Sequence, residues 1–456
     1  MTPALVAILS LIVLGIPITL AVDRRARGPL LIGASFLYGS GAMFVVLLAL
    51  SIAHLRWTLF SVAAAALAVF GVAAIIAKRQ PTTGNRQPAA SPHVFDVITL
   101  LTIIGYALYA TLAPLWEWDF WAIWGLKAKA FLEIGGIDWH FLENLWNTFA
   151  HPDYPLLVPL NFDFVALVSG GWSDRWLGLL FVAWGTALLL IARALASREM
   201  KPFFASLLTL ALAALAVSSY LGLGEGALIA FGGAGVLFVR AALLDDDVTS
   251  WRHGALMLGF AANCKNEGLA LLAAVTVTVA LVSPSRGFAV SQENTQTARP
   301  RNRVTARLLR LWPAYALAIP WLLLRAMHVL PTDIAGGSAG SRLLARLPYA
   351  HEILAYLAAH LYEPWFWVAI LAGILIAPAA ARRREGFILS VTAIQLVFYV
   401  LAYLTTPHDI RWHVLTSWSR LTGQIALPIT FSVLLMLANS LRRGEDAPHA
   451  EARPDQ

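Results

Sequence analysis

The run PALVAILSLIVLGIPITLAV, from Pro3 to Val22, contains no charged residue and is long enough to cross a lipid bilayer. No positive segment precedes it and no convincing cleavage site follows it, so we expect a retained membrane span. Similar apolar runs recur along the 456 residues, of which 59% are hydrophobic and only 13% charged. A soluble domain keeps about 25% charged residues. The sequence therefore predicts an all-α, polytopic transmembrane bundle of about 12–13 membrane helices.

Polar loops divide the predicted spans into groups. We expect extra N-terminal transmembrane helices in 1–94, a core in 95–282 with a large outer loop at 116–155, a cytoplasmic linker at 283–310, C-terminal transmembrane helices in 311–443 and a polar tail at 444–456. The linker is polar, Arg-rich and contains proline, which is typical of a flexible connection. We find no internal repeat.

The individual crossings can be placed from the apolar runs. They are expected near 3–22, 29–53, 57–77, 95–115, 176–196, 203–221, 226–242, 311–327, 364–381, 386–404 and 421–440. The outer loop 116–155 and the loop 243–253, which is expected in the cytoplasm, lie on opposite sides of the membrane. An odd number of crossings must therefore join them, yet four apolar stretches lie between them. We expect 155–172, which carries Asn161 and Asp163, not to cross. The run 254–282 is expected to break at Lys265.

Charge sets the predicted orientation. The excess of 33 Lys+Arg over 26 Asp+Glu gives a pI near 9.7, and the basic residues gather in short loops. Such loops mark the cytoplasmic side of a membrane protein rather than a nucleic-acid surface. The clearest are Arg24–Arg27, Lys78–Arg86, Arg286–Arg310, Arg382–Arg384 and Arg442–Arg443. With these inside, the loop 116–155 faces outward.

Several function classes are disfavoured by missing motifs. Cys264 is the only cysteine, which excludes an internal disulfide and a Cys-based zinc site. The sequence contains no P-loop, Rossmann glycine pattern, GxSxG elbow or HExxH motif. ATP hydrolysis and nicotinamide chemistry are therefore not expected.

The outer loop opens with WEWDFWAIWGLKAK, in which Glu117 and Asp119 stand among tryptophans. One helical face collects Trp121, Trp124, Ala128, Phe131 and Leu132. This pattern predicts a helix lying in the membrane interface, with Lys127 and Lys129 reaching toward anionic groups. An ordinary aromatic belt is the alternative. Asp119 favours a functional role, because a carboxylate there gains little unless it faces a polar cavity.

The same loop ends in HPDYPLLVPL, where two prolines interrupt the helix and redirect the chain into the membrane. We expect His151, Asp153 and Tyr154 to be held at the membrane boundary as substrate contacts. A rigid start to the next helix is the alternative, since the prolines explain it without chemistry.

A second cluster combines Lys265, Asn266 and Glu267 inside an apolar run with Glu225 in YLGLGEGAL. A charge at such depth costs roughly 2.5–3.5 kcal/mol, and such residues normally line a cavity or pair. Lys265 suits a phosphate ligand. Mutual neutralisation of Lys265 and Glu267 is the alternative.

The third cluster, TTPHDIRWHVLTSWSRLTGQ, precedes the last predicted span. A helix beginning near Ser417 would offer free N–H groups to an anion, with Arg420 one turn inside. His413 is a further candidate for substrate contact. A metal site is the alternative, although the spacing matches no known motif. Its ligands would be His408, Asp409 and His413.

Together these motifs resemble the GT-C superfamily of integral-membrane glycosyltransferases, especially bacterial relatives of protein mannosyltransferases and lipid A aminoarabinose transferases. The matching pieces span about 95–430. They are the acid in an aromatic first loop (WEWDFW), the proline-rich return (HPDYPLLVPL), a second acid (GLGEGAL), a Lys-containing break (NCKNEGL) and a Ser-Arg element (TSWSRL).

The resemblance implies a sugar donor on polyprenyl phosphate and an acceptor hydroxyl on a glycolipid, polysaccharide or protein. It places transfer at the outer face of the bacterial cytoplasmic (inner) membrane and makes Asp119 the catalytic base. The donor phosphate is expected to bind Lys265, Arg420, Lys127 and Lys129. Further substrate contacts are expected from Glu117, His151, Asp153, Tyr154, Glu225, Asn266, Glu267 and His413.

The sequence also departs from that family. Glu117 and Asp119 are separated by a tryptophan where many relatives have adjacent acids, so a divalent metal is not required and the cofactor stays open. Three spans precede the first core span, and no large outer C-terminal domain follows. Two other functions are considered: a flippase or transporter of a lipid-linked sugar, because charges and broken helices also mark transport pathways, and a non-catalytic scaffold.

Overall fold

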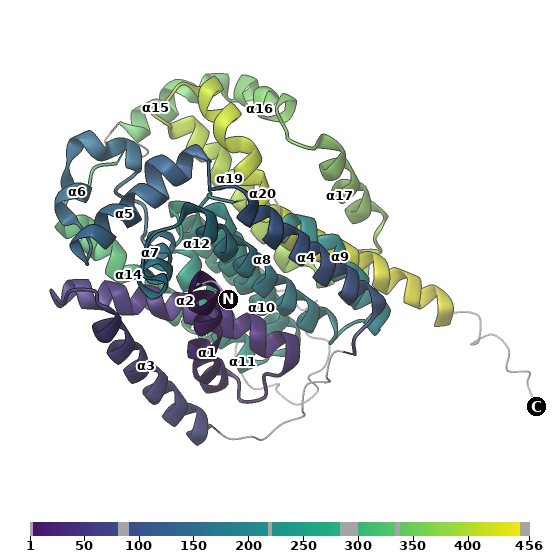
Figure 1. Ribbon diagram of the computed structural model, residues 1–456. Helices are drawn as coiled ribbons and strands as arrows, with labels where there is room; N and C mark the ends of the chain where they lie inside the picture. The colour runs from purple at the N-terminus through teal and green to yellow at the C-terminus, as the bar shows by residue number, and fades with distance from the viewer. Residues whose placement is uncertain (1–2, 81–90, 218–220, 283–299, 333–337, 447–456) are drawn as a thin grey trace, which may run out of the picture.

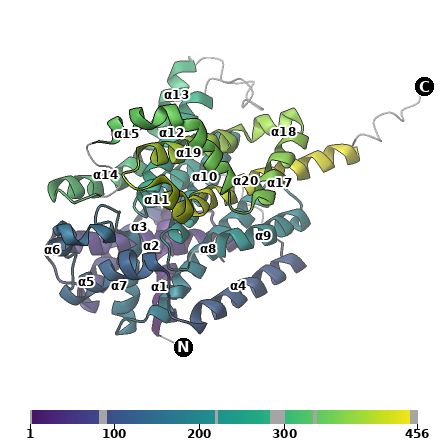
Figure 2. The same cartoon turned by 90° about the horizontal axis from the view of Figure 1, so that it is seen from above.

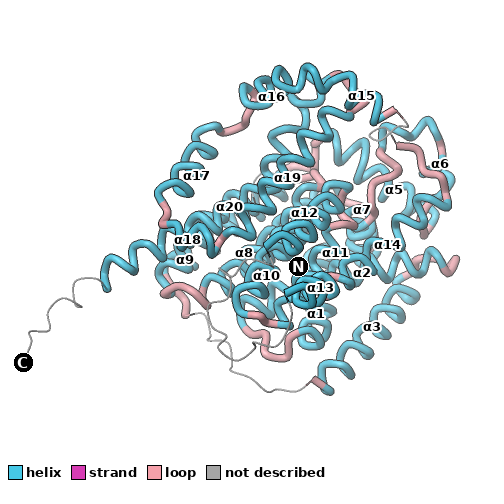
Figure 3. Tube along the Cα trace, turned by 180° about the vertical axis from the view of Figure 1, so that it is seen from behind, coloured by secondary structure: helices cyan, strands magenta, loops and turns pink. Residues whose placement is uncertain are grey.

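The computed structural model describes residues 3–80, 91–217, 221–282, 300–332 and 338–446, and within them the chain is helical with no strand (Figure 3). Eight helices are long and apolar enough to cross a membrane, so this is a multi-pass membrane protein. They are α1 (Pro3–Val22), α2 (Gly28–Ile52), α3 (Leu59–Arg79), α4 (Val94–Leu112), α8 (Asp174–Ala196), α10 (Glu225–Asp245), α19 (Gly386–Thr405) and α20 (Ile410–Asp446).

The remaining helices are shorter. The first half contains η1 (Phe120–Trp124), α5 (Gly125–Ile134), α6 (Trp139–Glu143), η2 (Leu145–Ala150), α7 (Leu157–Ser169), α9 (Pro202–Val217), α11 (Val248–Ala261) and α12 (Asn266–Val282). The second half contains α13 (Pro300–Leu309), α14 (Trp312–Met327), α15 (Ala339–Arg346), η4 (Leu347–Tyr349), α16 (Ala350–Ala359), α17 (Pro364–Ile376) and α18 (Ala379–Arg384).

The polytopic helical bundle is confirmed, but fewer helices are full-length spans than expected. A ninth span among the described residues requires counting 339–359 and α17, bent by 101°, as one crossing. Helix α7 has 13 residues and is therefore about 20 Å long, too short to cross the bilayer core of ~30 Å. This agrees with the expectation for 155–172. Helix α17 stops before Pro378, because the preceding Ala377 is extended.

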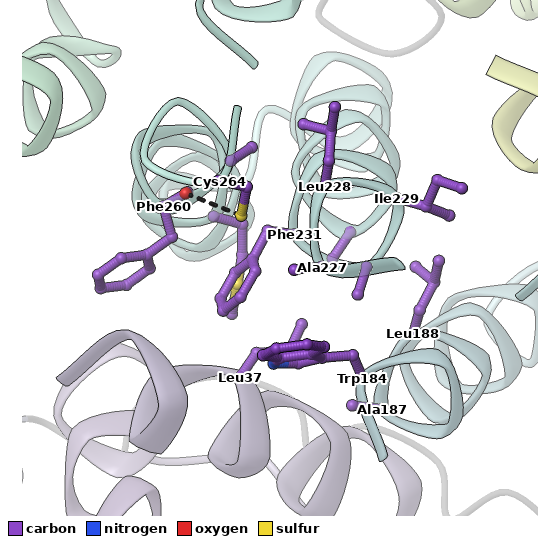
Figure 4. Packing of buried hydrophobic residues seen from close by; sticks show 14 of the residues in the cluster. Leu37, Trp184, Ala187, Leu188, Ala227, Leu228, Ile229, Phe231, Phe260 and Cys264 are labelled. Carbon is purple, nitrogen blue, oxygen red and sulfur yellow. Dashed lines mark hydrogen bonds between the residues drawn. The ribbon is translucent and has the colours of Figure 1, made fainter. Parts of the chain in front are cut away.

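Helix α10 forms the centre of the bundle and α4 lies at its edge (Figures 1 and 2). The apolar window of α10 is 94% buried, whereas those of α3 and α4 are 11% buried, which is the exposure expected of helices that face lipid. Side chains of α2, α8, α10 and α11 interlock around Trp184 and Phe231 (Figure 4). Cys264 is buried there, and its thiol donates to the Phe260 carbonyl.

Close helix approach relies on small residues. A Cβ at Gly15 would lie 1.7 Å from the Ser35 carbonyl oxygen, and one at Gly39 would lie 1.8 Å from the Leu11 carbonyl oxygen. Glycines at both crossings therefore let α1 and α2 touch through their backbones, the packing that membrane helices favour because lipid provides no hydrophobic drive.

Loops that were predicted to be cytoplasmic contact one another at one end of the bundle. Arg24 donates to the carbonyls of Lys78 and Gln80 at 3.3 and 2.6 Å. At the same end Arg310 pairs with Asp246 at 3.1 Å. Most of the predicted linker, 283–299, lies outside the described residues, but 300–309 form α13. The predicted tail begins as the end of α20, and 447–456 lie outside the described residues.

A buried arginine ties this end together. Arg240 in α10 donates through Nη1 to Glu199 Oε1 at 2.5 Å and through Nε to Glu385 Oε2 at 2.7 Å. Ser432 of α20 donates to the same Glu385 oxygen at 2.8 Å. Arg240, Glu385 and Ser432 are buried, so this part of the network joins α10, α20 and the residue before α19 in the protein interior.

Candidate functional site

The charged residues singled out in the sequence meet at the opposite end of the bundle. Arg420 Nη1 in α20 lies 2.5 Å from Asp119 Oδ2 in the first loop. Arg420 Nε lies 3.7 Å from Glu225 Oε1, at the first residue of α10. Helix α10 separates this site from the Arg240 end by about 20 Å, at 1.5 Å per residue. Segments distant in sequence are therefore joined by charge at one place.

Glu225 is the central acid. Its Oε1 lies 2.7 Å from Lys265 Nζ, and the same ammonium lies 2.9 Å from Glu267 Oε1. Glu225 and Lys265 are buried. The predicted pairing of Lys265 with Glu267 is present, but Glu225 is a second partner. We call this series the ion-pair chain; its members are Asp119, Arg420, Glu225, Lys265 and Glu267.

The local backbone explains how Asp119 reaches this position. The turn that follows it, η1, is π-helical, a form found often at functional sites. Gly222, at φ +85°, lets the chain before α10 approach the first loop: a Cβ there would lie 3.3 Å from Glu117 Cβ. Burial raises the pKa of Glu117, as does Asp119, while Arg420 lowers it.

The predicted break at Lys265 is confirmed. Helix α11 ends at Ala261 and α12 begins at Asn266. The Asn263 side-chain amide donates to the Gly259 carbonyl at the end of α11, at 2.8 Å, and to the Leu317 carbonyl of α14, at 2.9 Å, so it ties the break to α14. The break thus places Lys265 in the protein interior instead of on a lipid-facing helix.

Lys127 does not reach toward headgroups as predicted. It is fully buried, and its ammonium donates to the His151 carbonyl at 2.9 Å. The ring centroid of Tyr154 lies 5.7 Å from Lys127 Nζ and 5.6 Å from Lys265 Nζ, so both cations contact the same ring. Burial lowers the pKa of Lys127 to about 7, partly opposed by Asp153.

The prediction that the apolar face of this helix anchors in lipid is also wrong, because that face is buried in the protein. Trp124, Ala128 and Phe131 are fully buried in the protein, whereas Trp121 is exposed. Helix α5 packs against α7, so its apolar face contacts other helices. The periodicity identified residues that share a face, but that face points to the core.

The buried amine predicts an unusual pH dependence. The unfolded chain holds a proton on Lys127 up to its ordinary pKa of 10.5, while the folded chain releases it near 7. Below about pH 7 the folded chain carries the full cost of burying the charged ammonium, and this cost disappears as the pH rises. The unfolding free energy of wild type relative to Lys127→Met should therefore increase above about pH 7, by up to about 1.4 kcal/mol per unit.

Thermal unfolding in detergent between about pH 6 and 9 measures this difference. Lys129→Met is the matched control, because Lys129 is exposed on the same helix and should follow the wild-type profile. Parallel profiles for wild type and Lys127→Met would show that the amine keeps its proton throughout.

Asp153 joins the site from the other side. Its Oδ2 accepts from Asn266 Nδ2 at 3.2 Å and lies 3.2 Å from Arg325 Nη2. Trp321 donates to the Asp153 carbonyl at 3.4 Å, and His151 stacks on Tyr154 with ring centroids 4.6 Å apart. Sequence reasoning missed Arg325 and Trp321, although an arginine near the end of an apolar helix was a usable signal.

Two other predicted residues lie outside the ion-pair chain. Lys129 is exposed and pairs with Asp174 at 3.4 Å. His413 contacts the Thr406 hydroxyl at 2.9 Å. No helix begins at Ser417, because α20 starts at Ile410 after Asp409 caps Trp412 N–H at 2.9 Å. The predicted anion site at a helix N-terminus near Ser417 is therefore wrong, and Arg420 lies inside α20.

The metal alternative gains no geometric support. Across the residues that the structure describes, no group of three or more His, Cys, Asp or Glu side chains is arranged to hold a metal ion. His408 and His413 face each other with ring centroids 5.8 Å apart.

A stripe of neutral polar residues on α19 was not predicted. Gln395, Tyr399 and Tyr403 follow one another at spacings of four, which puts them on one helix face. Gln395 donates to the Glu267 carbonyl at 3.5 Å, and Tyr399 donates to Gln424 at 2.7 Å. The stripe thus lines the site from α19. The repeat of four was its only signal in the sequence.

Eight of the 18 buried polar atoms that lack a hydrogen-bond partner among the described residues lie here. They are Trp124 Nε1, Asp153 Oδ1, Glu225 Oε2, Asn266 Oδ1, Glu267 Oε2, Gln395 Oε1, Arg420 Nε and Gln424 Nε2. Native proteins keep few such groups, and each one has a cause. Eight such atoms around the ion-pair chain suit recognition of a polar, hydroxyl-rich ligand.

Comparison with protein-family models, curated proteins and solved structures finds no match to this chain. The function of the site therefore has to be argued from its own residues.

Proposed function

We propose that the protein is a membrane glycosyltransferase that moves a sugar from a polyprenyl-phosphate donor to an acceptor hydroxyl at the outer face of a bacterial cytoplasmic membrane. One observation carries the proposal. Asp119 in the first loop is paired at 2.5 Å with Arg420, 301 residues away, at the end of the bundle remote from the basic loops. This arrangement combines a proton acceptor with a phosphate-binding cation.

Asp119 is assigned as the base. Arg420 holds Oδ2, which orients the carboxylate so that Oδ1 can accept the proton of the acceptor hydroxyl. The hydroxyl oxygen then forms a bond to the anomeric carbon. The bond from that carbon to the phosphate oxygen breaks, its electron pair stays on the lipid phosphate, and configuration at the anomeric carbon inverts.

The cations are assigned to the leaving phosphate. Negative charge grows on that phosphate during transfer and is stabilised by donors that are already in place. Arg420 is the best-supported donor because its Nε has no hydrogen-bond partner among the described residues and its planar fork suits phosphate. Lys265 is the second donor; to bind the phosphate it exchanges one of its carboxylate partners, Glu225 or Glu267, for a phosphate oxygen. Lys127 contributes by positioning His151, and Lys129 is not assigned a role.

Transport of a lipid-linked sugar is the second candidate. The observation that favours it is the interruption between α11 and α12, which places Lys265 at a break in an apolar run. A transporter moves the donor between leaflets and leaves its sugar–phosphate bond intact, whereas a transferase cleaves it.

The deciding experiment is a glycan and glycolipid profile, by mass spectrometry, of a deletion strain with and without the wild-type gene. We expect one sugar to disappear and to return on complementation. Purified protein in proteoliposomes with a labelled polyprenyl-phosphate sugar and membrane-extracted acceptors should then release the lipid phosphate. Redistribution of intact donor between leaflets without cleavage would support transport instead.

A further inference from the structure

A polar cavity of about 250 Å³ lies between the α2–α3 turn and the loop that joins α5 to α6. It shares no residue with the ion-pair chain. Its lining residues are Ser51, His54, Leu55, Arg56, Ile134, Gly135, Gly136, Ile137 and Trp139. The Trp57 amide donates to the Gly135 carbonyl at 2.7 Å, which fixes the two walls relative to each other.

His54 occupies a strained position in this wall. It has φ +55° two residues after the end of α2, directly after the C-cap residue Ala53, and its amide donates to the Ser51 carbonyl at 3.0 Å. Glycine is the preferred residue there, because a side chain in the left-handed region is unfavourable. The imidazole is exposed and therefore gains little from packing. Such strain is retained where the side chain itself has a use.

Arg56 and Ser51 supply hydrogen-bond donors. The Arg56 side chain has no ion-pair or hydrogen-bond partner among the described residues, and its stem lies against Gly135, where a Cβ would be 2.8 Å from Arg56 Cγ. Ser51 is only 8% exposed. Its oxygen accepts the Ile137 N–H at 3.1 Å, so its own hydroxyl hydrogen can donate to a ligand.

The cavity continues onto an apolar surface. Leu55 in its wall and the nearby Phe60 of α3 are exposed, Phe60 by 83%. Trp139 stacks on His328 with ring centroids 3.8 Å apart, an aromatic group of the kind found at the level of lipid headgroups. The Arg56 guanidinium thus lies beside a surface suited to acyl chains.

We propose that this cavity binds the phosphate headgroup of an anionic phospholipid. Arg56 would hold the phosphate oxygens through its guanidinium, with Ser51 and His54 donating from either side. A membrane lipid is favoured over free phosphate because the apolar wall offers contact to its chains. The proposal concerns a separate cavity and does not depend on the proposed function.

The test is the thermal unfolding of the detergent-purified full chain on addition of phosphatidylglycerol, phosphatidylcholine or inorganic phosphate. We expect phosphatidylglycerol alone to raise the Tm of wild type. Arg56→Gln should weaken the apparent affinity for phosphatidylglycerol by about tenfold or more. Arg175→Gln, an exposed arginine at the first turn of α8, is the matched control and should respond as wild type does.

His54→Gly separates binding from folding. Glycine relieves the strain at φ +55°, so its Tm without lipid should equal or exceed that of wild type while the phosphatidylglycerol response weakens. An undiminished response in Arg56→Gln would overturn the proposal. An equal Tm rise with inorganic phosphate would overturn the lipid assignment and leave a simple anion site.

Discussion

Asp119→Asn is expected to lower sugar transfer by about 10²–10⁴-fold, the contribution typical of a positioned general base. Asparagine keeps the size of the side chain and an oxygen for Arg420, but it cannot take the proton of the acceptor hydroxyl. The Asp119 and Arg420 side chains are only 15% and 25% exposed, so the unfolding midpoint of the variant is measured as well, to separate lost catalysis from lost folding. The measurement is release of lipid phosphate from labelled donor in proteoliposomes.

Asp174→Asn is the matched control for this variant. Asp174 is a carboxylate at the same end of the bundle, but its partners are Lys129 and the indole N–H of Trp172, outside the ion-pair chain. It should transfer sugar at the wild-type rate. Normal turnover in Asp119→Asn would remove Asp119 as the base, and loss of turnover in Glu117→Gln alone would transfer that role to Glu117.

Much of the fold follows from the sequence because apolar runs of bilayer length have few alternatives in lipid. The predicted span 3–22 coincides with α1, and 386–404 differs from α19 by one residue. Helix ends were less predictable. Asp409 starts α20 well before the expected 421, because side-chain capping and contacts to α19 extend the helix beyond its apolar run.

Part of the site was also predictable. Asp119, Glu225, Lys265 and Arg420 stand out as charges in apolar surroundings, and the structure joins all four. The direction of Lys127 was not predictable, because a lipid-facing and a protein-facing helix surface are equally apolar in a membrane protein.

The neutral residues of α19 gave a weaker signal for a related reason. Gln395, Tyr399 and Tyr403 are inexpensive in an apolar helix compared with a charge, so composition alone does not reveal them. Their contacts to Glu267, Gln424 and Ser417 depend on how α12, α19 and α20 pack. That packing is a tertiary property, which no single run of sequence contains.

Arg240→Met is expected to lower the free energy of unfolding by about 3–5 kcal/mol, the largest stability effect that we predict. Methionine fills part of the same space but leaves Glu385 buried, with Ser432 as its remaining bonded partner. The measurement is the unfolding midpoint in detergent. Arg252→Met is the control, because Arg252 is exposed on α11 and no ion pair holds it among the described residues.

A double variant separates the cost of leaving the Glu385 carboxylate unpaired from the net contribution of the Arg240–Glu385 pair to the free energy of unfolding. Glu385→Leu combined with Arg240→Met removes both ends of the interaction, and replacing a buried pair by apolar groups is often neutral or stabilising. We therefore expect the double variant to be more stable than Arg240→Met alone, with a coupling free energy of about 0.5–3 kcal/mol. Additive losses would mean that Glu385 keeps its charge through other partners, and the role of Arg240 would then reduce to packing against Phe431, 5.8 Å from its guanidinium.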